Sequence, residues 1–224
     1  KIILLTGASS GIGEATARRL VQAGHHLVIG ARRIERLQAL RDELGNIDCL
    51  AIDVTQAEDL AKMAQFALQQ HGRIDVLINN AGVMPLSPLA ALKMEEWRQT
   101  IDVNVHGVLN GIAAVLPTMQ QQRAGQIINV ASIGAHAVFP LSAVYCASKF
   151  AVRAISDGLR QESDYIRVTV VSPGVVASEL ADHITDASAK ASMEGFRRIA
   201  LPAEAIADAI AWSIEQPDSV DVSE

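Results

Sequence analysis

The stretch Thr6-Gly7-Ala8-Ser9-Ser10-Gly11-Ile12-Gly13 joins an apolar run at residues 1–6 to a helical pattern that continues to Gly24. A buried strand that passes through glycines into the start of a helix is an anion-binding arrangement, because free backbone N–H groups point at the ligand. Glycines permit the tight turn and let the backbone approach a pyrophosphate. The spacing is G-x-x-x-G-x-G, which is neither the common G-x-G-x-x-G nor a P-loop, so the stretch alone favours dinucleotide binding without establishing it.

Strands and helices alternate along the rest of the chain. Apolar runs predict further strands at residues 26–31, 47–52, 74–78, 125–131 and 165–171, with helical patterns between them. This alternation is typical of an α/β fold, in which helices cover both faces of a parallel sheet. The chain has 224 residues, half of them apolar, which suits a single domain over residues 1–224 with one core. We therefore predict a doubly wound, Rossmann-like parallel sheet in a three-layer sandwich.

Polar or glycine-containing stretches come directly after several of these strands. They are Thr6-Gly7, Arg32, Asp53, Asn79-Asn80-Ala81-Gly82 and Ser132. Sheets of this kind bind ligands at the carboxyl ends of their strands. Because those ends meet at one edge of the sheet, we expect these residues to line one site.

The composition argues against several classes of partner. A net charge of −6 at pH 7 disfavours binding to nucleic acid or to an anionic membrane. No apolar run approaches the roughly 18 residues of a membrane span, and the run at residues 2–5 is too short for a signal peptide. The two cysteines fit neither a disulfide framework nor a metal cluster, so we expect a cytoplasmic protein. The six histidines show no metal-ligand spacing, so we expect no metal site.

The second predicted strand ends in Ala31, and Arg32 and Arg33 follow at once. In dinucleotide-binding folds an acidic residue near this point bonds the ribose 2′-hydroxyl, whereas an arginine accommodates a 2′-phosphate. A charge-assisted hydrogen bond to that phosphate contributes about 1.5–3 kcal/mol, or roughly a 10- to 100-fold preference. The alternative is that both arginines are solvated residues at a helix start, where the helix dipole disfavours cations. We therefore predict NADP(H) over NAD(H).

A long helix is predicted at residues 97–119, and it is apolar almost all round from residue 101 to residue 116. One side must cover the sheet, and the other needs a partner. We expect a homo-oligomer, a tetramer or a dimer, with this helix and a helix at residues 142–163 at one interface. Asn104 lies inside the apolar helix and needs hydrogen-bond partners there.

Tyr145 and Lys149 stand four residues apart in a predicted helix at residues 141–159. Such a pair shares one helical face. A free tyrosine has a pKa of about 10, and an ammonium group held close favours the phenolate. Lowering the pKa to about 7 takes roughly 4 kcal/mol and makes a general acid and base suited to neutral pH. A lone Y-x-x-x-K is weak support, because chance pairs on surface helices are common.

Taken together and in order, these motifs resemble the classical short-chain dehydrogenase/reductase family over nearly the whole chain. The resemblance is carried by Thr6–Gly13, Asp53-Val54, Asn79–Gly82, Asn104, Ser132, Tyr145-x-x-x-Lys149 and Pro173-Gly174. It implies a sheet of about seven strands, the seventh at residues 219–224. It also implies a nicotinamide cofactor and hydride transfer to or from a carbonyl or alcohol carbon.

The resemblance further implies a role for each matching residue. Tyr145 is similar to the family's proton donor and acceptor, Lys149 to the residue that lowers the tyrosine pKa and holds the nicotinamide ribose. Ser132 matches the hydrogen-bond donor to the reacting oxygen, and Asn104 the residue that shapes the active-site helix. The expected cofactor-binding residues are Gly7, Ser9, Ser10, Gly11, Ile12, Gly13, Arg32, Arg33, Asp53, Val54, Asn80, Ala81, Gly82, Tyr145, Lys149, Pro173, Gly174, Val176 and Ser178. The expected substrate contacts are Ser132, Tyr145 and Gly174.

Residues 175–201 lose the apolar pattern and turn small and polar, so we expect a lid over the substrate there. The resulting hypothesis is an NADP(H)-dependent alcohol dehydrogenase or carbonyl reductase that acts on a small molecule. One alternative is a catalytically idle NADP(H)-binding sensor or scaffold on the same fold, because a fold does not imply a function. Another is an epimerase or dehydratase, but those relatives carry a longer substrate domain. The sequence names neither the substrate nor the direction of the reaction.

Overall fold

Six parallel strands form one sheet in the order β3-β2-β1-β4-β5-β6. The computed structural model describes all 224 residues, except for the side chain of Arg197. The strands are β1 (Ile2–Thr6), β2 (His26–Ala31), β3 (Ile47–Ala51), β4 (Val76–Asn79), β5 (Gly125–Val130) and β6 (Ile166–Val171). The order reverses between β1 and β4, which opens a crevice at the carboxyl ends of these two strands. The predicted α/β fold with a doubly wound parallel sheet is confirmed.

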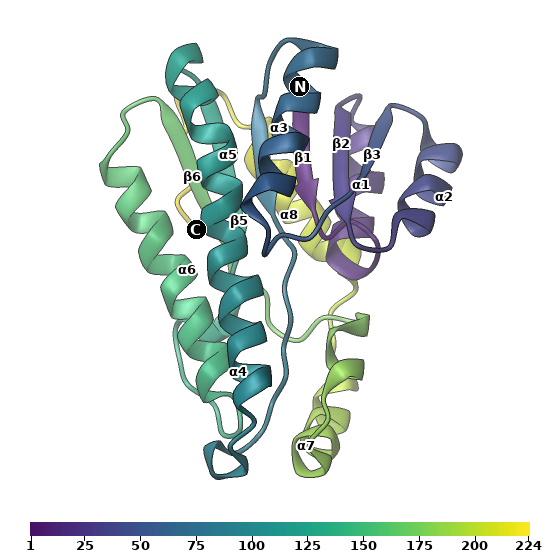
Figure 1. Ribbon diagram of the computed structural model, residues 1–224, viewed down its shortest axis with the longest axis vertical. Helices are drawn as coiled ribbons and strands as arrows, with labels where there is room; N and C mark the ends of the chain where they lie inside the picture. Colours follow the sequence, from purple (N-terminus) through teal and green to yellow (C-terminus); the bar gives the residue numbers. More distant parts are fainter.

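Helices cover both faces of the sheet, as the three-layer prediction requires (Figure 1). One layer holds α3 (Ala57–His71), α5 (Gly107–Gln122) and α6 (Ala143–Gln161), and the other holds α1 (Gly11–Gln22), α2 (Ile34–Leu44) and α8 (Ala203–Glu215). The strands alternate their side chains between two buried clusters, since successive residues of a strand point to opposite faces. Leu4 and Val28 pack under the first layer, whereas Ile3 and Leu27 pack under the second.

The long helix predicted at residues 97–119 contains an irregular turn. It begins as α4 (Met94–Ile101), passes through a π-helical turn at Asp102–His106, and continues as α5. Such π turns occur inside α-helices, frequently at functional sites. Val108, Ile112 and Val115 of α5 pack on the sheet, and Leu109 on its outer side is 42% exposed. Among the described residues, no helix is both long enough and apolar enough to cross a membrane.

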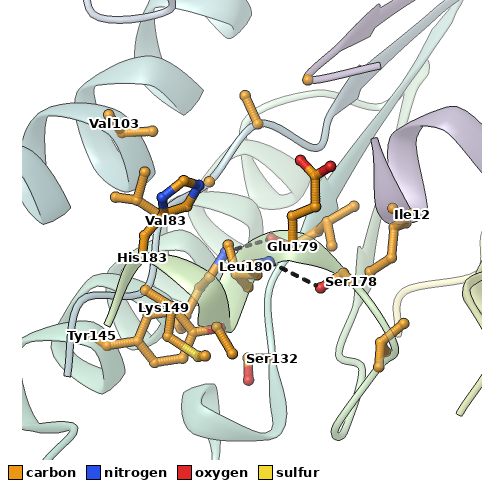
Figure 2. A pocket seen from close by; sticks show the side chains of 18 of the residues that line it. Ile12, Val83, Val103, Ser132, Tyr145, Lys149, Ser178, Glu179, Leu180 and His183 are labelled. Atoms are coloured by element: carbon orange, nitrogen blue, oxygen red, sulfur yellow. Dashed lines mark hydrogen bonds between the residues drawn. The ribbon is translucent and has the colours of Figure 1, made fainter. Parts of the chain in front are cut away.

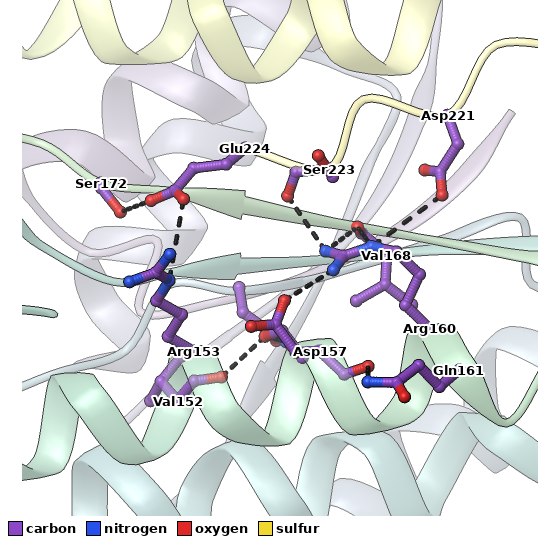
Figure 3. Close-up of polar contacts among 12 residues, drawn as sticks. Val152, Arg153, Asp157, Arg160, Gln161, Val168, Ser172, Asp221, Ser223 and Glu224 are labelled. Atoms are coloured by element: carbon purple, nitrogen blue, oxygen red, sulfur yellow. Dashed lines mark hydrogen bonds and ion pairs between the residues drawn. The ribbon is translucent and has the colours of Figure 1, made fainter. Parts of the chain in front are cut away.

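The seventh strand predicted at residues 219–224 is wrong. This stretch runs beside β6 but makes a backbone bond from Val170 N to Ser223 O (3.0 Å) rather than a ladder. Arginine side chains also bond carbonyls of this stretch: Arg160 donates to Ser223 O (3.1 Å), and Arg167 to Val220 O (3.1 Å). Figure 3 shows Arg160 between β6 and this terminal stretch.

Residues 175–201 leave the sheet after β6 and return before α8. They contain a short 3-10 helix, Glu179–His183, and the helix α7 (Ala187–Arg197). The two ends of this segment are joined by an isolated bridge between Val176 and Leu201, with Ala177 N donating to Leu201 O at 2.9 Å. In Figure 1 the segment extends beyond the carboxyl edge of the sheet, opposite α4.

Candidate active site

A cleft of about 1460 Å³ lies at the carboxyl edge of the sheet. It brings together, from elements far apart in the chain, nearly every site residue that the sequence predicts. Those that line it are Gly7, Ser9, Ser10, Gly11, Ile12, Gly13, Arg32, Arg33, Asp53, Val54, Asn80, Ala81, Gly82, Ser132, Tyr145, Lys149, Pro173, Gly174, Val176 and Ser178. Asn104 lies outside the lining, one layer behind it.

The glycine turn after β1 has no room for side chains. Gly7 has a φ of 71°, and a Cβ there would lie 2.7 Å from Ala81 Cα. A Cβ on Gly13 would lie 2.2 Å from the Gly7 carbonyl oxygen. The turn therefore leads directly into the start of α1 with its backbone exposed to the cleft. This is a cradle that suits a diphosphate, because the first N–H groups of a helix have no partner within the helix.

The end of β4 holds this turn in place. The Thr6 hydroxyl accepts hydrogen bonds from Asn80 N (3.1 Å) and Ala81 N (3.2 Å). The Asn80 amide donates in return to Thr6 O (3.0 Å) and Gly7 O (3.1 Å). Hydrogen bonds thus join the ends of β1 and β4 at the point where the strand order reverses. Through them, Asn80 positions the glycine turn.

Tyr145 lies on the cleft side of α6 and is 9% exposed. The side chain of Ser132, which follows β5, lies on the same side of the cleft as the phenol and contributes to its electrostatic environment. Ser132 Oγ also accepts a bond from Gly134 N (3.0 Å), which orients the hydroxyl. Burial raises the pKa of Tyr145 above its ordinary value, and the Ser132 hydroxyl acts in the opposite direction.

Lys149, one helical turn beyond Tyr145, is 6% exposed. Its Nζ donates to Val130 O (2.9 Å) and lies 5.9 Å from the centre of the Tyr145 ring (Figure 2). Burial lowers the pKa of Lys149 to about 8. That Lys149 lowers the pKa of Tyr145 stays a prediction.

Asn104 is buried in the π turn and links two parts of the site. Its Nδ2 donates to Val83 O (2.9 Å) and to Ser148 Oγ (3.0 Å), and its Oδ1 accepts from Val83 N (2.9 Å). A Cβ on Gly82 would lie 3.4 Å from Asn104 Oδ1 and 3.8 Å from Lys149 Nζ. Asn104 therefore fixes the loop after β4 against the helix that carries Tyr145 and Lys149. Ser148 completes this arrangement, and nothing in the sequence pattern marks it.

On the basic side of the cleft, the two predicted arginines point in different directions. Arg32 is exposed at the rim, whereas Arg33 turns back over the glycine turn. The Arg33 guanidinium donates to Ser9 Oγ (3.1 Å), Ser10 Oγ (2.8 Å) and Glu179 Oε2 (2.7 Å). Arg36, which the sequence reasoning missed, donates to Glu179 Oε1 (2.7 Å). Hydrogen bonds from Arg36 and Arg33 lower the pKa of Glu179 to about 2, so it is a carboxylate at neutral pH.

The segment 175–201 covers the cleft from the other side. Figure 2 shows Ser178 and Glu179 of this segment across the space from Tyr145 and Lys149, whereas His183 of the same segment lies nearer to Lys149 in this view. Two of its apolar side chains, Ile184 and Ala189, form a small buried cluster with Tyr145. The catalytic tyrosine predicted from the sequence is therefore buried in part by this segment.

Comparison with known proteins defines the class. A family model described as short chain dehydrogenase matches residues 1–189. An uncharacterized oxidoreductase of Staphylococcus saprophyticus is 48% identical over 231 aligned residues, which cover 100% of this chain and 94% of that protein. The chain belongs to the short-chain dehydrogenase/reductase family and is an oxidoreductase of that family.

Two solved structures show the same fold with a bound nucleotide. A closed form of serine dehydrogenase complexed with NADP⁺ is 34% identical, with a TM-score of 0.93 over 99% of this chain and 92% of that chain. An alcohol dehydrogenase from the archaeon Thermococcus sibiricus, complexed with 5-hydroxy-NADP, is 28% identical, with a TM-score of 0.90 over 100% of this chain and 94% of that chain.

Proposed function

We propose that this protein is an NADP(H)-dependent alcohol dehydrogenase or carbonyl reductase that acts on a small molecule. The observation that carries the proposal is the group of Ser132, Tyr145 and Lys149 in the lining of one cleft, whose other end is a glycine turn without room for side chains. The fit of this turn to a diphosphate supports a dinucleotide in the cleft. When bound, NADP(H) supplies or accepts the hydride at the reacting carbon.

The residues of the chain handle the proton and the charge on oxygen. In the reducing direction, Tyr145 Oη gives its proton to the carbonyl oxygen, and in the oxidising direction it takes the proton of the alcohol. The Ser132 hydroxyl, held by Gly134 N, donates a hydrogen bond to the same oxygen and stabilises the charge that develops on it. Lys149 provides a buried cation beside the tyrosine ring. Asn104 is a positioning residue, because it acts through Val83 and Ser148.

The preference for NADP(H) rests on Arg33 and Arg36. Both guanidinium groups lie beside the glycine turn, where a 2′-phosphate can accept charge-assisted bonds. Glu179 already occupies one nitrogen of each arginine and competes with a phosphate for them. The remaining cofactor contacts of the proposal are the residues that line the cleft from Gly7 to Gly13, at Asp53 and Val54, from Asn80 to Gly82, and from Pro173 to Ser178.

A cofactor experiment separates these contributions. The value of kcat/KM is measured with NADPH and NADH at matched salt. NADPH should be preferred by roughly 10- to 100-fold, and Arg33→Ala should remove most of the preference. Glu179→Gln should raise NADPH affinity and leave NADH affinity nearly unchanged, because the competing carboxylate is lost. Equal or better kcat/KM with NADH in the unmodified protein contradicts the NADP(H) assignment and leaves the rest of the proposal intact.

We further propose that residues 175–201 act as a lid over the substrate. The support is the position of this segment across the cleft from Tyr145 and the single bridge, Val176 with Leu201, that closes its base. Apolar side chains and a few polar ones, from this segment and from the loops opposite, line the space between them, which suits a small, partly apolar substrate: Met84, Leu86, Phe139, Met193, Gln99 and Ser192.

We also propose that the protein is cytoplasmic and forms a homo-oligomer. Exposed apolar side chains on the outer helix layer support an interface there, with Leu109 of α5 42% exposed and Phe150 of α6 39% exposed. Two free cysteines, Cys49 and Cys146, suit a reducing compartment. Light scattering at micromolar concentration should give a dimer or tetramer mass, and the 23.9 kDa mass of one chain contradicts this part of the proposal.

The direct test of the function is turnover with a panel of aldehydes, ketones and secondary alcohols, assayed with both cofactors. Consumption of NADPH with at least one carbonyl compound is the expected result. If the protein binds NADPH tightly but turns over no member of the panel in either direction, it is a binding protein and the enzyme proposal is wrong.

A further inference from the structure

Away from the cleft, three side chains from separate elements meet at the opposite edge of the sheet. His26 begins β2, Asp48 is the second residue of β3, and His71 ends α3. His26 Nε2 and His71 Nε2 each lie 2.9 Å from Asp48 Oδ2. The two imidazole centroids are 4.2 Å apart, with the rings tilted by 48°. The ligand atoms of all three residues lie within 4.8 Å of one another.

The fold places these residues together for simple geometric reasons. Asp48 pairs with Val28 across the two strands, and His26 lies two residues before Val28, so the two side chains share one face of the sheet. Helix α3 packs on that face through Leu60, Ala64 and Ala67. His71 comes four residues after Ala67 and continues this inward stripe at the end of the helix.

We propose that His26, Asp48 and His71 bind a divalent transition-metal ion of the zinc class, with water completing the coordination. Two imidazole nitrogens and one carboxylate oxygen form a donor set that Zn²⁺ uses in proteins. Metal–ligand bonds of about 2.0–2.2 Å place the donors of a tetrahedral site roughly 3.3 Å apart. The two His–Asp distances of 2.9 Å therefore need to lengthen by only a few tenths of an ångström.

The surroundings of the three ligands suit an ion. The side chains of His26, Asp48 and His71 are 31%, 32% and 19% exposed, so an ion and a water molecule can reach them while the ligands stay anchored. The carboxyl end of α3 carries the partial negative charge of the helix dipole, which favours a cation beside His71. Cys49 is excluded as a ligand, because it points to the other face and its Sγ lies 3.2 Å from Leu37 O.

The position of the site indicates a structural role. Asp48, His26 and His71 belong to the amino-terminal ends of β2 and β3 and to the end of α3, whereas Ser132 and Tyr145 lie at the carboxyl edge of the sheet. A metal ion here joins three elements of the half that carries Arg33 and Asp53. We infer that the ion stabilises this half and takes no part in proton or hydride transfer.

The test uses the purified chain after removal of metals with a chelator. Titration calorimetry with Zn²⁺ should show one site per chain, and Zn²⁺ should raise the thermal midpoint of unfolding. Co²⁺ should give the visible absorption bands of a four-coordinate ion with nitrogen and oxygen ligands. His71→Gln and Asp48→Asn should each weaken Zn²⁺ binding by at least the roughly 10- to 100-fold that follows loss of an outer-shell partner.

The matched control is His106→Gln. His106 Nδ1 lies 3.1 Å from Asp102 Oδ1 in an exposed pair that lacks a third ligand, so this change should leave Zn²⁺ affinity unaltered. Two results overturn the proposal: absence of stoichiometric Zn²⁺ binding by the folded, unmodified chain, or unchanged affinity in folded His71→Gln. The Co²⁺ spectrum of the unmodified chain tests the ligand set even if a variant fails to fold. None of these readouts depends on NADPH turnover.

Discussion

The carboxyl edge of the sheet and the segment 175–201 form two sides of the same cleft, but they are held by different forces. At the edge, the backbone is closely packed: a Cβ on Gly13 would lie 2.2 Å from the Gly7 carbonyl oxygen, and Asn80 N donates a hydrogen bond to the Thr6 hydroxyl at 3.1 Å. The segment is held at its base by one bridge and near its start by Glu179, whose arginine partners are 42% and 49% exposed. Further along, it is held by hydrogen bonds of Thr185 with Lys93 and Glu96.

This difference indicates that the edge of the sheet is rigid and that the segment is more easily displaced. Close backbone packing allows little adjustment, because even one extra methyl group forces its neighbours to shift. Exposed ion pairs contribute little and are screened by salt, so the contact of Glu179 with the two arginines can break at low cost. Tyr145 stands between the two regions: its helix belongs to the edge, but Ile184 and Ala189 of the segment help to bury its ring.

The largest expected effect comes from the edge. Tyr145→Phe should lower kcat by at least the roughly 10²- to 10⁴-fold that a general acid or base contributes, with NADPH affinity nearly intact, because the ring and its packing remain. The control is Tyr165→Phe, which alters the other tyrosine of the chain, stacked against Arg123. More than a tenth of the original activity in Tyr145→Phe would show that the proton follows another path.

The buried charge of Lys149 gives the next effect, which is on stability. Its pKa is about 8 in the folded protein against an ordinary value of 10.5, so the unfolded state binds more protons between these two values. Folding stability of the cofactor-free protein should therefore rise, relative to Lys149→Met, as the pH increases from 8 towards 10.5. At about 1.36 kcal/mol per pH unit the gain is on the order of 3 kcal/mol.

Thermal unfolding from pH 7 to pH 10 measures this difference. Lys190→Met, which removes an exposed lysine of the segment, is the control and should not show the same pH dependence. If stability depended on pH in the same way for the unmodified protein and for Lys149→Met, the Lys149 ammonium would be well solvated in the folded protein.

A pair of glycine changes compares the packing of the two regions. Gly13→Ala should cost about 1–3 kcal/mol of stability and weaken NADPH binding, because its methyl group has no space. Gly195→Ala in α7 meets no atom within 4 Å and should be neutral or stabilising by up to about 1 kcal/mol. Chemical denaturation measures both. A similar cost at the two positions would remove the distinction between a tightly packed edge and a loosely packed segment.

The smallest expected effect is on the pKa of Tyr145, which packs against both regions. In a Tyr165→Phe background, Ile184→Ala should lower the pKa of Tyr145, because burial is what raises it. The ultraviolet absorbance of the phenolate follows the titration. Ile199 belongs to the same segment, and its side chain is 74% exposed. Ile199→Ala should therefore leave the pKa of Tyr145 unchanged. An identical titration in both variants would mean that the segment does not control the environment of the phenol.

Sequence reasoning predicted the strands well, because their signals are local. Each apolar run ends in a polar or glycine residue, and the carboxyl ends of parallel strands must meet at one edge, so the position of the cleft followed from the chain alone. The prediction of a strand at residues 219–224 was wrong because contacts with distant side chains decide its structure. Its own residues allow a strand, but the stretch is joined to β6 by one backbone bond, from Val170 N to Ser223 O, and by the side chains of Arg160 and Arg167 rather than by a ladder.

The chain by itself determined which residues gather in the cleft, since periodicity and glycine positions are properties of neighbouring residues. Packing between distant elements decided the details. Arg33, rather than Arg32, reaches the glycine turn and meets Glu179, which lies 146 residues away. His26, Asp48 and His71 meet only because β3 lies beside β2 and α3 crosses above them. Such contacts depend on how complete helices and strands pack against each other. No local pattern of residues encodes which distant residues this packing brings together.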